Sequence, residues 1–338
     1  MLSLGYKLMS EEHGPKELVT NAERAERAGF DFAAISDHFF PWIEEQGHSP
    51  LAWSVLGAIA NATDRLGLIT AVTCPIMRYH PAIIAQGAAT LGLLTGGRFT
   101  LGLGSGERLN EHVVGLGWPG IAERHERFCE AVDIIQGLLK GELTNYRGKY
   151  LQLDNAKLYD RPSKKPPVVI AAGGPKAAGL AGEKGDGLVT TEANKELVEA
   201  FRAAGGKGPR YAEVGMCCAR SEEDARKTAH KYFRWSLTGW SVQAELPDTK
   251  GFEAASRYIT PETAAEKITC GPSVERHLEA VRKYTDAGFD HIVLTQIGPE
   301  QGYFLEVFEK ELAPALHEKK RISPRAKPLA KERDGRHT

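Results

Sequence analysis

The sequence lacks the features that would place it in a membrane or in an oxidising compartment. No apolar run approaches the length that spans a bilayer, and the opening MLSLGYKLMSEEHG has no apolar core typical of a signal peptide. The five cysteines (Cys74, Cys129, Cys217, Cys218 and Cys270) are odd in number and have no C-x-x-C spacing, unlike a disulfide framework or a zinc site. These absences predict a soluble, cytoplasmic protein with reduced thiols and no metal site.

The chain also lacks an excess of charge of either sign. Its 338 residues carry a formal net charge of −1, and 42% are hydrophobic and 26% charged. A nucleic-acid partner would require a concentrated basic face, so none is expected. The basic stretch at residues 321–338, RISPRAKPLAKERDGRHT, has no hydrophobic periodicity, which predicts a disordered tail.

Strand and helix patterns alternate almost throughout residues 1–320. Apolar runs such as LSLGYKL, FDFAAIS and PPVVIAAGG are each followed by a helical stretch, and several of these begin at Pro or stop at Gly. Eight such units, with strands apolar enough to be buried on both faces, predict one α/β domain, a (β/α)8 TIM barrel. A doubly wound open sheet is the alternative. It is disfavoured because GLGSGE, a G-x-G-x-G run, lies in the fourth unit and does not open the chain.

Two segments interrupt the alternation of strands and helices. Residues 142–165 follow the fourth unit and predict an inserted hairpin and loop. Residues 237–270 follow the seventh unit and predict a second long insertion. The expected architecture is therefore a barrel with insertions after strands 4 and 7.

In a TIM barrel the active site lies at the carboxyl ends of the strands. The segments expected there are KLMSEE, SDHFFPW, TAVTCP, GSGERLNE, AAGGP, TTEANK, CCARSEE and QIGPEQ. They are rich in glycine, small hydroxyls and acids, and one of them carries a conspicuous imidazole. This composition predicts a pocket for a flat, partly anionic ligand.

The imidazole of His38, within ISDHFFPW, is the first candidate for chemistry. A histidine can take a proton from a hydroxyl near neutral pH, and a partly buried carboxyl such as Glu107 can act as an acid. An alcohol–carbonyl interconversion also needs a redox cofactor, because no side chain transfers hydride. The plain alternative is a surface or hydrogen-bonded histidine.

Two further strand-end features have both a functional and a plain interpretation. Trp42 could wall the site against water, or it could belong to a small hydrophobic lid. The glycine pair Gly173 and Gly174 in AAGGP could cradle a phosphate at a helix N-terminus, or it could form a tight turn.

The strand-end motifs, taken in order, resemble one known family. GYK with SEE, ISDHFFPW, TAVTCPIMRYHPAIIAQ, GLGSGERLNE, AAGGP and GDGLVTTE follow the pattern of the luciferase-like F420-dependent oxidoreductases. The chain resembles the F420-dependent glucose-6-phosphate dehydrogenase group and is also similar to the F420-dependent secondary alcohol dehydrogenases. The resemblance implies a luciferase-like TIM barrel that holds coenzyme F420 at its strand ends, and a homodimer.

The resemblance also implies roles for particular residues. His38 matches the base that takes the substrate's hydroxyl proton, Glu107 the acid, and Trp42 and Glu11 the residues that shape the catalytic site. A non-prolyl cis peptide falls at Ala71-Val72. The positions that match cofactor contacts are Asp37, Ala71, Val72, Cys74, Gly106, Asn110, Ala172, Gly173 and Gly174. The positions on the substrate side are Thr191, Asn194 and Arg276.

The chain departs from the sugar-phosphate enzymes where they bind phosphate. Asn194 stands at the position of one lysine, and Glu253 is the best match for another, so only Arg276 resembles the cationic cluster. Since a phosphate dianion needs several converging donors, these departures disfavour glucose 6-phosphate. The substrate expected is an alcohol, a carbonyl compound or a sugar phosphate. The alternatives are an FMN-dependent luciferase-like monooxygenase and a non-catalytic cofactor-binding barrel.

Overall fold

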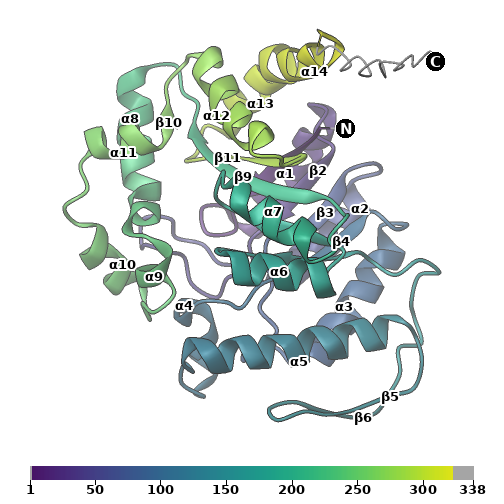
Figure 1. Ribbon diagram of the computed structural model, residues 1–338. Coiled ribbons are helices and arrows are strands. Elements are labelled where there is room, and N and C mark those ends of the chain that lie inside the picture. The colour runs from purple at the N-terminus through teal and green to yellow at the C-terminus, as the bar shows by residue number, and fades with distance from the viewer. Residues whose placement is uncertain (1, 323–338) are drawn as a thin grey trace, which may run out of the picture.

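Eight parallel strands close into a barrel surrounded by helices (Figure 1). The structure, a computed structural model, describes residues 2–322. In order around the barrel the strands are β1 (Ser3–Leu8), β2 (Phe32–Ile35), β3 (Gly67–Thr70), β4 (Phe99–Leu103), β7 (Val168–Ala171), β8 (Gly187–Thr190), β9 (Arg210–Cys217) and β11 (His291–Gln296). β8 pairs with β9, β9 with β11, and β11 with β1, which closes the ring. The predicted (β/α)8 barrel is confirmed.

The helices occupy the positions that the sequence pattern predicts after most strands. They are α1 (Pro15–Arg27), α2 (Ala52–Ala62), α3 (Pro81–Leu94), α4 (Arg108–Glu111), α5 (Ile121–Leu139), α6 (Pro175–Lys184), α7 (Lys195–Ala203), α8 (Glu222–Phe233), α9 (Trp240–Gln243), α10 (Thr249–Ser256), α11 (Pro261–Lys267), α12 (Val274–Asp286), α13 (Gln301–Val307) and α14 (Ala313–Ile322). None of the helices within residues 2–322 combines the length and the apolar character needed to cross a bilayer.

Local sequence signals account for where these helices begin and end. Pro15 opens α1, and Gly29 follows its end with φ +92°, a left-handed conformation that favours glycine. The Ser221 hydroxyl caps α8 by accepting a hydrogen bond from the Asp224 N–H at 3.1 Å. The His80 ring caps α3 in the same way at the Ala82 N–H.

The barrel strands are buried on both faces, as their continuous apolar sequences predict. Val168, Val169 and Ile170 of β7 have no exposed surface. The barrel interior is packed by Phe32, Ala34, Ile69, Val169, Tyr211 and Val293. A cavity of about 130 Å3, lined by residues that include Phe32, Tyr211 and His291, opens at the amino ends of the strands. It lies away from the carboxyl ends, where barrel enzymes carry their active sites.

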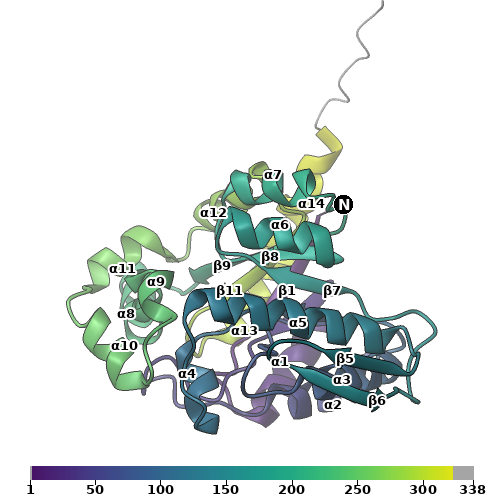
Figure 2. The same ribbon diagram turned by 60° about the horizontal axis from the view of Figure 1, so that its bottom comes forward.

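Both predicted insertions are present (Figures 1 and 2). The first contains an antiparallel hairpin of β5 (Thr144–Arg147) and β6 (Gln152–Ala156) that lies beside α5. The second contains α9, α10 and α11 and ends in β10 (Thr269–Cys270), which pairs with the end of β9. In both views α9–α11 lie beside α8 on one flank of the barrel. The tail was predicted from residue 321, but residues 321 and 322 belong to α14, and residues 323–338 lie outside the described residues.

Candidate active site

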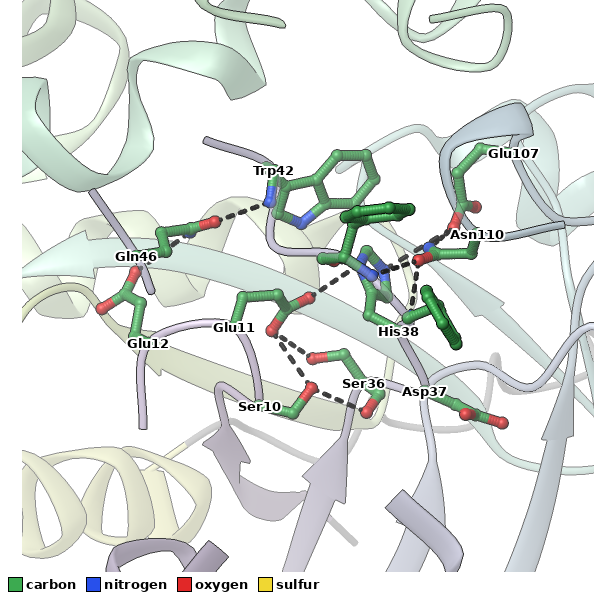
Figure 3. A network of polar contacts seen from close by, with 12 residues as sticks. Ser10, Glu11, Glu12, Ser36, Asp37, His38, Trp42, Gln46, Glu107 and Asn110 are labelled. Atoms are coloured by element: carbon green, nitrogen blue, oxygen red, sulfur yellow. Dashed lines mark hydrogen bonds and ion pairs between the residues drawn. The ribbon is translucent and has the colours of Figure 1, made fainter. Parts of the chain in front are cut away.

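Three strand ends bring His38, Glu11 and Glu107 together (Figure 3). Glu11 follows β1, His38 follows β2 and Glu107 follows β4. The His38 Nδ1 lies 3.4 Å from Glu11 Oε1, and the His38 Nε2 lies 3.7 Å from Glu107 Oε1. The imidazole is 9% exposed, so it is neither a surface histidine nor sealed in the core. The predicted gathering of an imidazole and carboxylates at the strand ends is thus present in the structure.

Each ring nitrogen of His38 faces a different set of oxygen atoms. The second oxygen of Glu11 accepts a hydrogen bond from the Ser36 hydroxyl at 2.7 Å, and Glu11 is buried. His38 Nδ1 faces Glu11 and the Phe40 carbonyl oxygen, which lies at 3.2 Å, so both of its neighbours are acceptors. Both ring nitrogens of His38 therefore face acceptor oxygens, with Glu11 and Phe40 at Nδ1 and Glu107 at Nε2.

Asn110 ties the loop after β2 to the turn after β4. Its side-chain oxygen accepts hydrogen bonds from the Phe39 N–H at 2.7 Å and the Phe40 N–H at 3.1 Å. Its amide nitrogen donates to Glu107 Oε1. Asn110 therefore fixes the position of Glu107 relative to the loop that carries His38. Its predicted contact with a cofactor stays a prediction.

Trp42 covers one side of His38 and packs against the second half of the chain. The ring centroids of His38 and Trp42 are 4.6 Å apart. Trp42 stacks on Trp235 at 4.1 Å with an interplanar angle of 11°, and Phe252 meets it edge-on at 5.1 Å. Both interpretations of Trp42 are compatible with this packing, because a buried lid residue here also walls the site.

The carboxylate of Asp37 faces away from His38 (Figure 3) and has no exposed surface. Its oxygens accept hydrogen bonds from Thr73 at 2.7 Å, Trp53 at 3.2 Å, Tyr79 at 3.3 Å and Arg78 at 3.1 Å. The Asp37 carboxylate therefore binds four protein side chains. Its predicted contact with a cofactor stays a prediction.

Arg78 and Glu111 are part of the site's support and were not expected from the sequence. The Glu111 carboxylate has no exposed surface, accepts a hydrogen bond from the Arg78 N–H at 2.9 Å and lies 3.5 Å from Arg78 Nε. Burial raises the pKa of Glu111 to about 7, although both Arg78 contacts oppose the shift. No motif pointed to this pair, because both residue types are common in exposed loops.

Replacing Arg78 by methionine should lower the free energy of unfolding by about 3–5 kcal/mol, because Asp37 and Glu111 would be left buried without a cation. Chemical denaturation of the variant and the original protein measures the difference. Lys227→Met is the matched control, since Lys227 pairs with Glu223 in full solvent and its loss should leave stability unchanged within error. Equal effects of the two substitutions would contradict the structural role of Arg78.

Glycines and small residues shape the strand ends beside these charged groups. The peptide Ala71-Val72 is cis, as predicted. Gly106 has φ +73°, and a Cβ there would lie 2.5 Å from the Cys74 sulfur, so only glycine fits. A Cβ added to Gly174 would meet nothing within 4 Å, which leaves the N-terminus of α6 open. Ala172 is buried, and its N–H donates to the Val189 carbonyl oxygen.

A buried ion pair lies inside the barrel. Lys7 Nζ is 2.7 Å from Glu213 Oε2 and donates a 3.3 Å hydrogen bond to the Ala71 carbonyl oxygen. The Thr295 hydroxyl donates to the other oxygen of Glu213 at 2.8 Å. The sequence pattern of these strands did not predict the ion pair, because Lys7, Glu213 and Thr295 lie on different strands and meet only in the closed barrel.

Two of the three residues expected on the substrate side, Asn194 and Arg276, use their side chains in contacts with protein groups. The Asn194 oxygen caps α7 by accepting from the Glu196 N–H at 2.9 Å. Arg276 pairs with both oxygens of Glu222 at 3.0 and 3.1 Å. Thr191 is exposed, and its carbonyl oxygen accepts a hydrogen bond from the Tyr284 hydroxyl. Their contacts with a substrate stay predictions.

Fold and site together define a (β/α)8-barrel enzyme with acid–base groups at its strand ends. The chain belongs to the luciferase-like monooxygenase family, whose family model matches residues 3–291. The resemblance inferred from the motifs is therefore confirmed.

Relatives within this family share almost the whole length of the chain. The F420-dependent glucose-6-phosphate dehydrogenase of Beutenbergia cavernae is 35% identical over 333 residues, which cover 95% of this chain and 99% of the relative. The enzyme of the same name from Segniliparus rotundus is 38% identical over 331 residues, with 93% and 98% covered. A solved structure of an F420-dependent secondary alcohol dehydrogenase in complex with an F420-acetone adduct superposes with a TM-score of 0.87. It is 29% identical, with 93% of this chain and 99% of that chain covered.

Proposed function

We propose that this protein is an F420-dependent oxidoreductase that interconverts an alcohol and a carbonyl compound and that its substrate carries no phosphate group. The observation that carries the proposal is the arrangement of Glu11, His38 and Glu107 at the strand ends. The F420-dependent enzymes named above supply the cofactor class.

His38 acts as the general base in the direction of alcohol oxidation. Its Nε2 takes the proton of the substrate hydroxyl, and Glu11 stabilises the imidazolium that forms, because its carboxylate faces Nδ1. Coenzyme F420, when bound, would supply the hydride acceptor that no side chain provides. In the reductive direction His38 returns the proton to the carbonyl oxygen. Glu107, whose Oε1 lies 3.7 Å from His38 Nε2, is a second group that can transfer a proton at the site.

The residues present fit a flat, partly anionic cofactor. Gly106 and Val72 border the strand ends closely, and any side chain at Gly106 would collide with Cys74. Ala172, Gly173 and Gly174 lead into α6, whose first N–H groups have no side-chain cap. An uncapped helix N-terminus with no Cβ in the way suits a phosphate group. Ala71-Val72, Gly106 and Gly173-Gly174 would therefore hold the cofactor.

The substrate side of the site supports an uncharged substrate. Arg276 is already paired with Glu222, and the Asn194 amide is used as a helix cap. Glu253, the position matched to a second lysine, is an acid, and its carboxylate accepts a hydrogen bond from the Glu44 N–H. A phosphate dianion would have to compete with these carboxylates for its donors. This favours a neutral alcohol or carbonyl compound over glucose 6-phosphate.

Cofactor choice tests the proposal directly. Mixing the purified protein with oxidised coenzyme F420 should quench the deazaflavin fluorescence in a saturable way, whereas FMN should bind weakly and support no oxygen consumption. Tight FMN binding with oxygen consumption, and no quenching of F420, would instead establish the flavin monooxygenase alternative.

We also place the protein in the cytoplasm as a homodimer. All five cysteines are free thiols, which suits a reducing compartment. The adjacent outer helices α2 and α3 contain no charged residue, although outward faces of soluble helices normally carry charges. Leu51, Ile83 and Leu94 are 50%, 59% and 58% exposed on this face, so a second copy covering it would remove apolar surface from water.

A charge placed on this face should produce monomers. Ile83→Glu and Leu94→Glu each put a carboxylate into the proposed interface, where desolvation opposes association. Light scattering should report a monomer for the double variant and a dimer for the original protein. Tyr258→Glu is the matched control, because Tyr258 is 85% exposed and lies between α10 and α11. A double variant that remains dimeric would show that the subunits meet elsewhere.

A further inference from the structure

Gln46 lies where the loop after β2 meets the end of α8 and the segment after β1. Its side chain is 3% exposed, although it belongs to the loop that follows β2. Figure 3 shows it between Trp42 and Glu12. A buried carboxamide needs partners for both its oxygen and its nitrogen, and this one has them.

The oxygen of Gln46 holds the backbone of Trp42. Gln46 Oε1 accepts a hydrogen bond from the Trp42 N–H at 2.9 Å. The nitrogen holds two distant segments: Nε2 donates to the Tyr232 carbonyl oxygen at 3.2 Å and to Glu12 Oε1 at 3.5 Å. One side chain therefore connects the Trp42 backbone to the end of α8 and to the end of β1.

Glu12 extends this connection to the last barrel strand. Its other oxygen accepts a hydrogen bond from the Gly298 N–H at 2.7 Å, just beyond β11. Tyr232 lies three residues before Trp235, on which the indole of Trp42 stacks. Through Gln46, the segments that carry the stacked rings of Trp42 and Trp235 are thus connected to each other and to the ends of β1 and β11.

We propose that Gln46 is a positioning residue that sets the indole of Trp42 against His38 by binding the Trp42 N–H and the Tyr232 carbonyl oxygen at once. The ion pairs at the outer side of the same loop are more exposed: the Glu45 side chain, paired with Arg234, is 35% exposed. Gln46 is buried, and it joins the Trp42 backbone to Tyr232, three residues before Trp235. The kinetic consequence rests on the proposed function, and the position of the indole does not.

Gln46→Glu is the principal variant. Its carboxylate still accepts from the Trp42 N–H, but it has no N–H to donate to the Tyr232 carbonyl oxygen or to Glu12 Oε1. Adding Glu12→Gln restores one donor–acceptor pair between positions 12 and 46. Gln46→Met, which has a similar shape and no amide, serves if the charged variant does not fold. Gln301→Glu is the control for disturbance of the surrounding frame, because Gln301 is also 3% exposed and holds the Gln296 and Gly298 carbonyl oxygens, and it is joined to Gln46 through Gly298 and Glu12.

Two readouts separate positioning from general destabilisation. The first is the near-ultraviolet circular dichroism of Trp42, taken as the difference between each variant and the same variant with Trp42→Phe; it needs no cofactor. The second is kcat, KM and the coenzyme dissociation constant. Gln46→Glu should lose most of the Trp42 signal and lower kcat by about 10- to 100-fold with coenzyme binding retained. Glu12→Gln in the same chain should restore part of both, and Gln301→Glu should lower stability alone.

Several outcomes would overturn the proposal. An unchanged Trp42 signal in Gln46→Glu or Gln46→Met would show that the ring stack alone orients the indole. A loss of signal without any recovery in the double variant, matched by Gln301→Glu, would show a purely structural role. If the original protein turned over no alcohol with F420, the proposed function would fail, while the dichroism would still decide whether Gln46 positions Trp42.

Discussion

His38→Asn should lower kcat for alcohol oxidation by about 10²- to 10⁴-fold, the range expected for loss of a general base. Asparagine keeps a polar group near Glu11 but cannot accept the hydroxyl proton. Coenzyme binding should change little, because no cofactor position assigned above uses the imidazole. Steady-state kinetics with F420 and a secondary alcohol, together with fluorescence titration of the coenzyme, measure the two effects separately.

The control for this substitution lies on the same loop. His48→Asn alters an exposed histidine whose backbone N–H, and not its ring, contacts the Glu11 carbonyl oxygen. It should keep kcat within a factor of about two of the original protein. If His38→Asn behaved like His48→Asn, His38 would not be the general base. Either another group would act as the base, or the protein would be a non-catalytic cofactor-binding barrel.

Uncharged secondary alcohols should exceed glucose 6-phosphate in kcat/KM by about 10²- to 10⁴-fold. Charge-assisted hydrogen bonds contribute about 1.5–3 kcal/mol each, so the lack of two unpaired cations costs a phosphate about 3–6 kcal/mol of binding. The geometry behind this estimate is the pairing of Arg276 with Glu222 and the use of Asn194 as a cap. A panel of secondary alcohols, the matching ketones and sugar phosphates, assayed with oxidised and reduced F420, provides the comparison.

A matched pair of variants tests the reason for that preference. Asn194→Lys with Glu253→Lys introduces two cations, and should raise kcat/KM for glucose 6-phosphate while leaving a neutral alcohol nearly unaffected. Thr20→Lys with Glu262→Lys, at exposed helix positions, changes the net charge by the same +3 and is the control for net charge. A strong preference of the original protein for glucose 6-phosphate would refute the assignment of an uncharged substrate.

Most of the architecture could be predicted because it depends on local sequence patterns. Short, continuously apolar runs such as VVIA at Val168–Ala171 are typical of strands that are buried on both faces. Helix boundaries follow from Pro and Gly. The order of strand ends then followed from the barrel rule, which placed His38, Glu107 and Glu11 at one face before any contact was known. The geometry confirms that these three meet.

The supporting contacts could not be predicted, because each joins side chains whose proximity depends on the closed barrel. Nothing in the residue types marks Gln46 as the group that holds Trp42, or Glu111 as the partner of Arg78. Asp37 shows the same limit: its place beside His38 suggested a ligand contact, whereas its carboxylate turns to Thr73, Trp53, Tyr79 and Arg78.

The sequence by itself therefore determined the barrel, the family and the strand ends that carry the acid–base groups, since period, turn residues and ordered motifs are local. The tertiary structure decided which partners those groups have. His38 lies between Glu11 at Nδ1 and Glu107 at Nε2, while Arg276 and Asn194 are engaged by protein partners. In ISDHFFPW, His38 faces Glu11 and Glu107 and Ser36 holds Glu11, whereas the closed barrel gives the Asp37 carboxylate four donors and turns it away.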